Sequence, residues 1–80
     1  MGKSVSTPVV TWNVIDNIEL FTEWDPSVNL IRTYALTTLD SESVWSAVNF
    51  HFMGILHIEE MYEIGLQSDG RVLFELALVQ

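Results

Sequence analysis

The segment Ser41–Glu60, with the sequence SESVWSAVNFHFMGILHIEE, decides the fold of this chain. From Ser43 to Ile58 it has no Asp, Glu, Lys or Arg, so these sixteen residues must lie mostly out of water or against a partner. A helical period of 100° per residue divides the segment into two opposite stripes. One stripe is Ser46, Asn49, Met53, His57 and Glu60, and the other, which is apolar, is Val44, Trp45, Val48, Phe52, Ile55 and Leu56.

The same segment also fits a strand, whose period is 180° per residue. The apolar face would then hold Val48, Phe50, Phe52, Leu56 and Ile58, and the other face Asn49, His51 and His57. Length favours the helix, because nearly twenty residues interrupted by a single glycine exceed an ordinary strand. Asp40 or Ser41 would cap it by accepting an amide hydrogen bond. We therefore predict a helix over residues 41–60, and a small all-β barrel if the segment is a strand.

Two alternating segments before the helix predict a hairpin. Val9–Ile15 and Ile18–Trp24 flank Asp16-Asn17, and both of these residue types favour a two-residue turn. A short helix from Asp16 is the alternative. A second turn is predicted at Asp25-Pro26-Ser27, although these residues would also suit the start of a helix. The Thr- and Tyr-rich segment Val28–Leu39 favours a third strand.

The end of the chain has the clearest hairpin signal. Asp69-Gly70 separates the alternating segments Met61–Leu66 and Arg71–Val79, and Gly supplies a positive φ at no steric cost. The last strand is apolar on both faces, which indicates a central strand or an interface. The predicted order is β-β-β-α-β-β. We expect an α+β fold with one helix packed on a mostly antiparallel five-stranded sheet, formed by a single domain at 8–80 after a flexible N-terminus at 1–7.

Charge and hydropathy limit the partners that the chain can have. Of its 80 residues 49% are hydrophobic, and eleven carboxylates against Lys3, Arg32 and Arg71 give a net charge of −8. A domain this small leaves apolar surface exposed, so an oligomer or a partner is expected. Nucleic-acid phosphates and anionic lipids require a basic surface, so we expect binding to neither nucleic acid nor membrane. The expected partner is a basic protein, a second copy of the chain, or both.

The absence of cysteine excludes disulfides and thiolate metal sites and fits a reducing compartment. The N-terminus lacks the apolar run of a secretory signal, and the uncharged run is shorter than the roughly twenty residues of a membrane span. We therefore expect a soluble, cytoplasmic protein, located in the host cytoplasm if a virus encodes it.

Candidate chemistry rests on two histidines. On a helix His57 would lie beside Glu60, but a catalytic zinc needs three protein ligands. We expect His51 to be a core histidine and neither histidine to bind a metal. No nucleophile motif and no phosphate-binding glycine loop appears in the sequence. We therefore expect a protein that is not an enzyme and needs no cofactor.

Two surfaces are predicted to bind partners. Acidic side chains beside aromatic ones suit the charged rim and the anchors of a tight interface, and they occur in two groups. The residues are Asp16, Glu19, Phe21, Glu23, Trp24 and Asp25 in the first group, and Glu59, Glu60 and Glu63 in the second. A self-association surface is predicted on the last strand, at Val72, Leu73, Phe74, Leu76 and Leu78.

Three functions fit these features. The acidic surface suggests a protein-protein interaction module, such as an inhibitor or an immunity- or antitoxin-type protein, that occupies a basic site on a nucleic-acid-handling partner. The apolar last strand suggests a self-assembling structural or accessory subunit instead. The third function is a small ligand-binding or catalytic barrel that uses His51 and His57.

Overall fold

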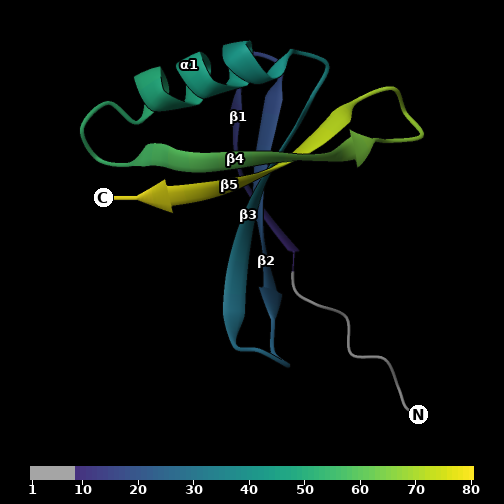
Figure 1. Cartoon of the computed structure of the whole chain (residues 1–80), viewed down its shortest axis with the longest axis vertical. Helices are drawn as coiled ribbons and strands as arrows, with labels where there is room; N and C mark the ends of the chain where they lie inside the picture. Colours follow the sequence, from purple (N-terminus) through teal and green to yellow (C-terminus); the bar gives the residue numbers. More distant parts are fainter. Residues whose placement is uncertain (1–8) are drawn as a thin grey trace.

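A computed structural model describes the backbone of residues 9–80 and the side chains of residues 15–80. The elements along the chain are β1 (Val9–Ile15), β2 (Ile18–Asp25), β3 (Leu30–Thr37), α1 (Ser41–His51), β4 (His57–Leu66) and β5 (Val72–Val79) (Figure 1). One helix together with an antiparallel sheet confirms the predicted α+β class. The segment 1–7, predicted to be flexible, lies outside the described residues.

The sheet has the strand order β1-β2-β3-β5-β4, and every neighbouring pair is antiparallel. β1 and β4 each have one neighbour, so the described sheet is open and these two strands form its edges. The alternative of a small all-β barrel is therefore wrong. The connection from β3 through α1 and β4 places β5, the last strand, between β3 and β4.

The helix is shorter than predicted, because it ends at His51 and not at Glu60. The chain turns over Phe52–Ile55, and Gly54 there adopts a φ of +84°, a left-handed conformation that is not part of an α-helix. β4 then begins at His57. The uncharged segment is thus a helix followed by a strand, which is why both periods fit it in part.

The start of α1 is capped as predicted. The carboxylate Oδ1 of Asp40 accepts a hydrogen bond from the backbone N–H of Ser43 at 2.7 Å. This hydrogen bond lowers the pKa of Asp40, since it favours the ionised form. The capping carboxylate satisfies one of the helix's otherwise unpaired N–H groups.

The core lies between α1 and one face of the sheet. Its buried apolar residues are Ile18, Leu20, Ala35, Val44, Val48, Ile58, Phe74 and Leu76. Val44 and Val48, one turn apart on α1, are fully buried, as their position in the apolar stripe predicts. Trp45 belongs to the same predicted stripe but is exposed. We refer below to the helix-covered face of the sheet and to the opposite, uncovered face.

The first two turns lie where the sequence predicts them. Asp16 and Asn17 connect β1 to β2, and Asp16 has a φ of +54°. After β2, the carboxylate Oδ1 of Asp25 accepts hydrogen bonds from the backbone N–H and the hydroxyl of Ser27, at 3.0 and 2.6 Å. These bonds hold a turn that leads into β3, so the alternative of a helix at this position is wrong.

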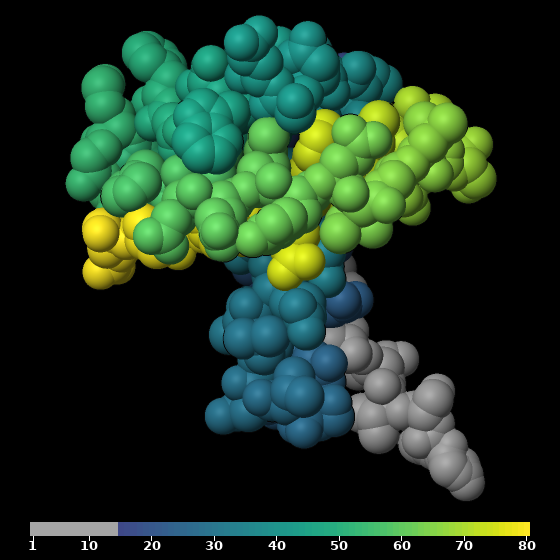
Figure 2. Space-filling view, in the orientation of Figure 1, coloured from purple at the N-terminus to yellow at the C-terminus, as the bar shows by residue number. Residues whose placement is uncertain are grey.

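The far half of the β2–β3 hairpin projects from the rest of the described chain. In Figure 1, β4 and β5 cross β3 at a steep angle, and α1 lies at the end of the hairpin away from the β2–β3 turn. Figure 2 shows the projecting half as a stem below the body that α1, β4 and β5 form. The helix therefore covers the near half of the hairpin only.

Candidate protein-interaction surfaces

The carboxylates predicted to cluster on β2 are spread along the whole strand. Glu19, Glu23 and Asp25 lie on the uncovered face together with Phe21, because the alternate positions near the helix are buried beneath it. Asp16 lies in the turn at the other end of β2 from Asp25. A strand of eight residues spans about 25 Å. The first acidic group is therefore a row of charges and not a compact cluster.

Trp24 lies on the opposite side of β2 from these carboxylates. Its cross-strand partner on β3 is Ile31, and the two side chains are 41% and 65% exposed. They share the helix-covered side of the sheet but lie next to the β2–β3 turn, since β2 ends at Asp25 and β3 begins at Leu30. Together with Val28, which is also exposed, they place apolar side chains near the end of the projecting hairpin.

A row of side chains crosses the uncovered face from β2 to β4. Phe21, Tyr34, Glu75 and Tyr62 are consecutive cross-strand partners on β2, β3, β5 and β4. The rings of Phe21 and Tyr34 stack with their centroids 5.2 Å apart. Burial raises the pKa of Tyr34, and the carboxylates of Glu23 and Glu75 raise it further. α1 lies on the other face, so no described helix covers this row.

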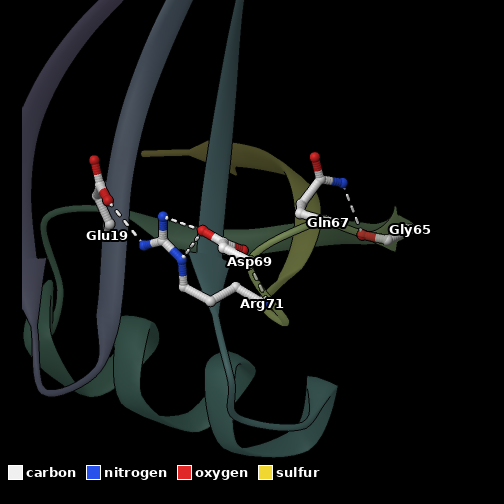
Figure 3. Close-up of polar contacts among 5 residues, drawn as sticks. All are labelled: Glu19, Gly65, Gln67, Asp69 and Arg71. Atoms are coloured by element: carbon white, nitrogen blue, oxygen red, sulfur yellow. Dashed lines mark hydrogen bonds and ion pairs between the residues drawn. The ribbon is translucent and has the colours of Figure 1, made fainter.

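Each arginine binds one carboxylate on the uncovered face of the sheet, and Arg71 binds a second one in the β4–β5 turn. Arg32 on β3 forms an ion pair with Glu75 on β5, at 3.4 Å. Arg71, next to β5, pairs with Glu19 on β2 at 3.1 Å and with Asp69 at 2.8 Å (Figure 3). The bond between Arg71 and Glu19 joins residues 52 positions apart in the sequence. The described ion pairs therefore involve three of the carboxylates.

The β4–β5 turn positions Arg71 for these contacts. The backbone N–H of Arg71 donates to Oδ1 of Asp69 at 3.0 Å, and this bond lowers the pKa of Asp69. The side-chain bonds to Asp69 and Glu19 raise the pKa of Arg71. In the same turn the side-chain amide of Gln67 donates to the carbonyl oxygen of Gly65 at 3.0 Å (Figure 3).

Eight of the eleven carboxylates form no ion pair with either described arginine. They are Asp16, Glu23, Asp25, Asp40, Glu42, Glu59, Glu60 and Glu63. Three of the eight lie within five consecutive positions of β4, which is the highest density in the described chain.

The three glutamates of β4, which we call the edge glutamates, are Glu59, Glu60 and Glu63. All three are exposed. Glu60 lies opposite Ala77 and Glu63 opposite Phe74, so these two side chains point to different faces of the sheet, and β4 has bulges near both. β3 and β5 separate them from β2, so the two predicted acidic groups do not form one patch.

The structure places part of the predicted self-association surface on β5 in the core. Phe74 and Leu76 are only 2% and 3% exposed and belong to the core, and Val72 and Leu78 pack against it from the same face. β5 is hydrogen-bonded to β4 along its whole length and to β3 from Val72 to Leu76, so it is an inner strand of the sheet over these residues. Leu73 lies on the uncovered face and is half-buried.

The structure also corrects two expectations about the histidines. His51 is exposed and contacts Phe52 edge-on with the ring centroids 4.9 Å apart, so it is not a core residue. His57 begins a strand, so the helical spacing that would place it beside Glu60 does not apply. In the described part of the chain, no group of three His, Asp or Glu residues is arranged to hold a metal ion.

The most exposed apolar group was not predicted from the sequence. Phe50, Met53 and Ile55 are 74%, 67% and 70% exposed where α1 leads into β4. We call these three residues the apolar turn. Gly54, in the middle of an apolar run, is the sequence signal that would have indicated a turn there.

The described residues form no pocket, and none of their helices is long and apolar enough to cross a membrane. In comparisons with known proteins, no family model, curated protein or solved structure matches this chain.

Proposed function

We propose that this chain is a small acidic protein-protein interaction module that occupies a basic site on another protein. The proposal rests on one observation, which is how the carboxylates are divided between those paired with arginine and those that are not. Both described arginines are engaged with Glu19, Asp69 and Glu75, while the edge glutamates have no arginine partner and are exposed. A basic partner would supply the cations that the described chain does not.

The edge glutamates are suited to guide such a partner. Exposed carboxylates of one sign attract a basic protein before contact and raise the association rate, and salt screens this attraction. Glu60 and Glu63 point to different faces of the sheet, so negative charge lies on both sides of the β4 edge. The exposed Tyr62 lies between them, and its hydroxyl donates to Glu60 at 2.8 Å.

The projecting β2–β3 hairpin offers a second contact element. Trp24 and Ile31 form an exposed cross-strand pair, with Glu23 and Asp25 on the other face of the same hairpin. Buried aromatic side chains supply much of the energy of protein interfaces, and surrounding charges set specificity. A projecting hairpin with this composition can enter a cleft in a partner.

A nucleic-acid-handling protein is the partner class that fits this chemistry. Such proteins carry basic sites that neutralise phosphates, and exposed carboxylates can compete with phosphates for those sites. An inhibitor, or an immunity- or antitoxin-type protein, would act in this way. The proposed action is binding, with no reaction catalysed by this chain.

The test is capture of a partner followed by binding with purified proteins. The tagged chain is incubated with lysate of its native host, bound proteins are eluted with salt, and each basic protein recovered is purified and titrated with the chain. The decisive variant is Glu59→Gln with Glu60→Gln and Glu63→Gln. Its matched control, Asp16→Asn with Asp40→Asn and Glu42→Gln, removes the same number of charges from outside both proposed contact elements.

We expect the edge variant to weaken binding at least tenfold and the control to weaken it much less. The supporting result requires a basic partner that binds the purified chain. Equal weakening by the two variants would show that net charge, and not the edge glutamates, drives binding. A captured partner that binds the edge variant as tightly as the unchanged chain would overturn the proposal.

A further inference from the structure

We propose that the apolar turn, Phe50, Met53 and Ile55, is the contact through which two copies of this chain form a dimer. This inference is independent of the proposed function, since it concerns another surface and another partner. It concerns a different surface from the one predicted on β5, where Phe74 and Leu76 belong to the core.

The apolar turn is held in place by its own backbone. The carbonyl oxygen of Phe52 accepts from the N–H of Ile55 at 2.7 Å and from that of Leu56 at 3.4 Å, and Phe52 packs against the core. The N–H of Met53 donates to the carbonyl oxygen of Phe50 at 3.4 Å. Gly54 permits the left-handed conformation that reverses the chain. The apolar side chains are therefore presented by a hydrogen-bonded turn.

Their exposed area is that of a contact surface. Aromatic side chains present about 150–250 Å² each and Met and Ile are at the lower end of that size, so three residues that are about 70% exposed present on the order of 300–400 Å². This is within the range of the largest apolar patch on a typical monomer, which is often functional. Two copies together would bury about 600–800 Å² from these side chains, which corresponds to a weak dimer.

The distribution of charge indicates where two copies of the chain can meet. The uncovered face carries Glu19, Glu23, Asp25, Glu60 and Glu75 against two arginines, and the edge of β4 carries the edge glutamates. Two copies that approach through either surface bring unneutralised carboxylates together. The segment 43–58 has no charged residue, so it is where two chains of net charge −8 can meet with the least repulsion.

The contact would be isologous, with the apolar turn of one copy against the same turn of the other. Such a dimer leaves both sets of edge glutamates exposed. Its dependence on salt distinguishes it from a complex with a basic partner. Salt screens the repulsion between two acidic copies and strengthens the dimer, whereas it weakens the attraction between opposite charges.

The test is sedimentation equilibrium of the purified chain, from micromolar concentration to about 1 mM, at low and high salt. We expect a monomer–dimer equilibrium whose dissociation constant falls severalfold on raising the salt. The variant Phe50→Ser with Ile55→Ser should raise that constant at least tenfold. The matched control, Ile64→Ser with Leu66→Ser, also removes two exposed apolar side chains and should leave it unchanged.

Because the chain has no cysteine, single substitutions can locate the contact directly. Met53→Cys or Ile55→Cys should form an intermolecular disulfide under an added oxidant much faster than Leu66→Cys. A monomer at every concentration would overturn the proposal, as would a dimer that the Phe50 and Ile55 substitutions leave intact. A dimer broken by Leu73→Gln alone would place the contact on the uncovered face and would also overturn it.

Discussion

The side-chain oxygen Oδ1 of Asn49 on α1 accepts a hydrogen bond from the backbone N–H of Ile58 on β4, at 2.7 Å. This bond joins the last turn of the helix to the beginning of the edge strand, on either side of the apolar turn. Ile58 is nearly fully buried, and buried backbone N–H groups need a hydrogen-bond acceptor. The side chain of Asn49 supplies that acceptor. Asn49 therefore fixes the geometry at the point where the helix stops and the strand begins.

Replacing Asn49 by Ala should destabilise the fold. Loss of the acceptor leaves a partly buried donor unsatisfied, and we expect the free energy of unfolding to fall by about 1–2 kcal/mol. Urea denaturation followed by circular dichroism measures this change. Asn49→Asp keeps an acceptor at the same position and should recover most of the loss. Equal stability of Asn49→Ala and the unchanged chain would show that the bond contributes nothing.

Replacing Phe74 by Ala tests which face of β5 forms the core. Phe74 is 2% exposed, and truncating a buried Phe removes about 3–5 kcal/mol of stability. In a domain whose total stability is about 5–15 kcal/mol, that loss should lower the urea midpoint of unfolding strongly. Leu66→Ala, at a residue that is 74% exposed, is the control and should change stability by less than about 0.5 kcal/mol. Similar effects of the two substitutions would contradict the assigned core.

The helix cap predicts a specific loss of stability in acid. The pKa of Asp40 is lowered in the folded chain, so its contribution is present above the unfolded pKa of about 3.9 and is lost as pH falls through the lower folded pKa. Asp40→Ala should therefore lower the melting temperature at pH 7, and its difference from the unchanged chain should vanish in strong acid. Asp40→Asn keeps a capping acceptor that does not titrate. At pH 7 this variant should have a higher melting temperature than Asp40→Ala. In acid it should lose less stability than the unchanged chain. A constant difference between Asp40→Ala and the unchanged chain from pH 7 down to pH 2 would contradict this role.

Substitutions of Gly54 should destabilise the fold through backbone strain and not through steric clashes. A Cβ there would meet nothing within 4 Å, but a φ of +84° disfavours residues with a side chain. Gly54→Ala should cost about 1–2 kcal/mol, measured by urea denaturation. Gly54→Asn should cost less, because Asn tolerates the left-handed region. If Ala and Asn cost the same, left-handed strain is not what sets the stability of this turn.

The features that depend on neighbouring residues could be predicted from the sequence. Asp25-Pro26-Ser27 and Asp69-Gly70 encode their turns through local hydrogen bonds and a positive φ at glycine, and both turns occur where they were expected. Asp40 likewise caps the helix through an amide three residues away. The alternating pattern before the helix identified β2 because Ile18 and Leu20 are buried in the core while Glu19 and Phe21 lie on the uncovered face.

The features that depend on distant contacts could not be predicted. The two-sided apolar pattern of β5 fits both a central strand and an interface, and pairing with β3 and β4 decides between them. The ion pair between Arg71 and Glu19 likewise arises only when β2 and β5 pair with opposite sides of β3 in the folded sheet. At 41–60 a helical and a strand segment adjoin, so a single period assigned to the whole segment misplaced the end of α1.

The central claim, that the edge glutamates bind a basic partner, is tested most directly by the dissociation constant of the complex with the captured partner over a range of salt concentrations. We expect the unchanged chain to bind at least about tenfold more weakly at high than at low salt, because exposed charges are screened. The variant with Gln at all three edge glutamates should bind the partner more weakly than the unchanged chain at low salt. Its dissociation constant should also depend less on salt. The same dissociation constants and the same salt dependence for both proteins would contradict the claim.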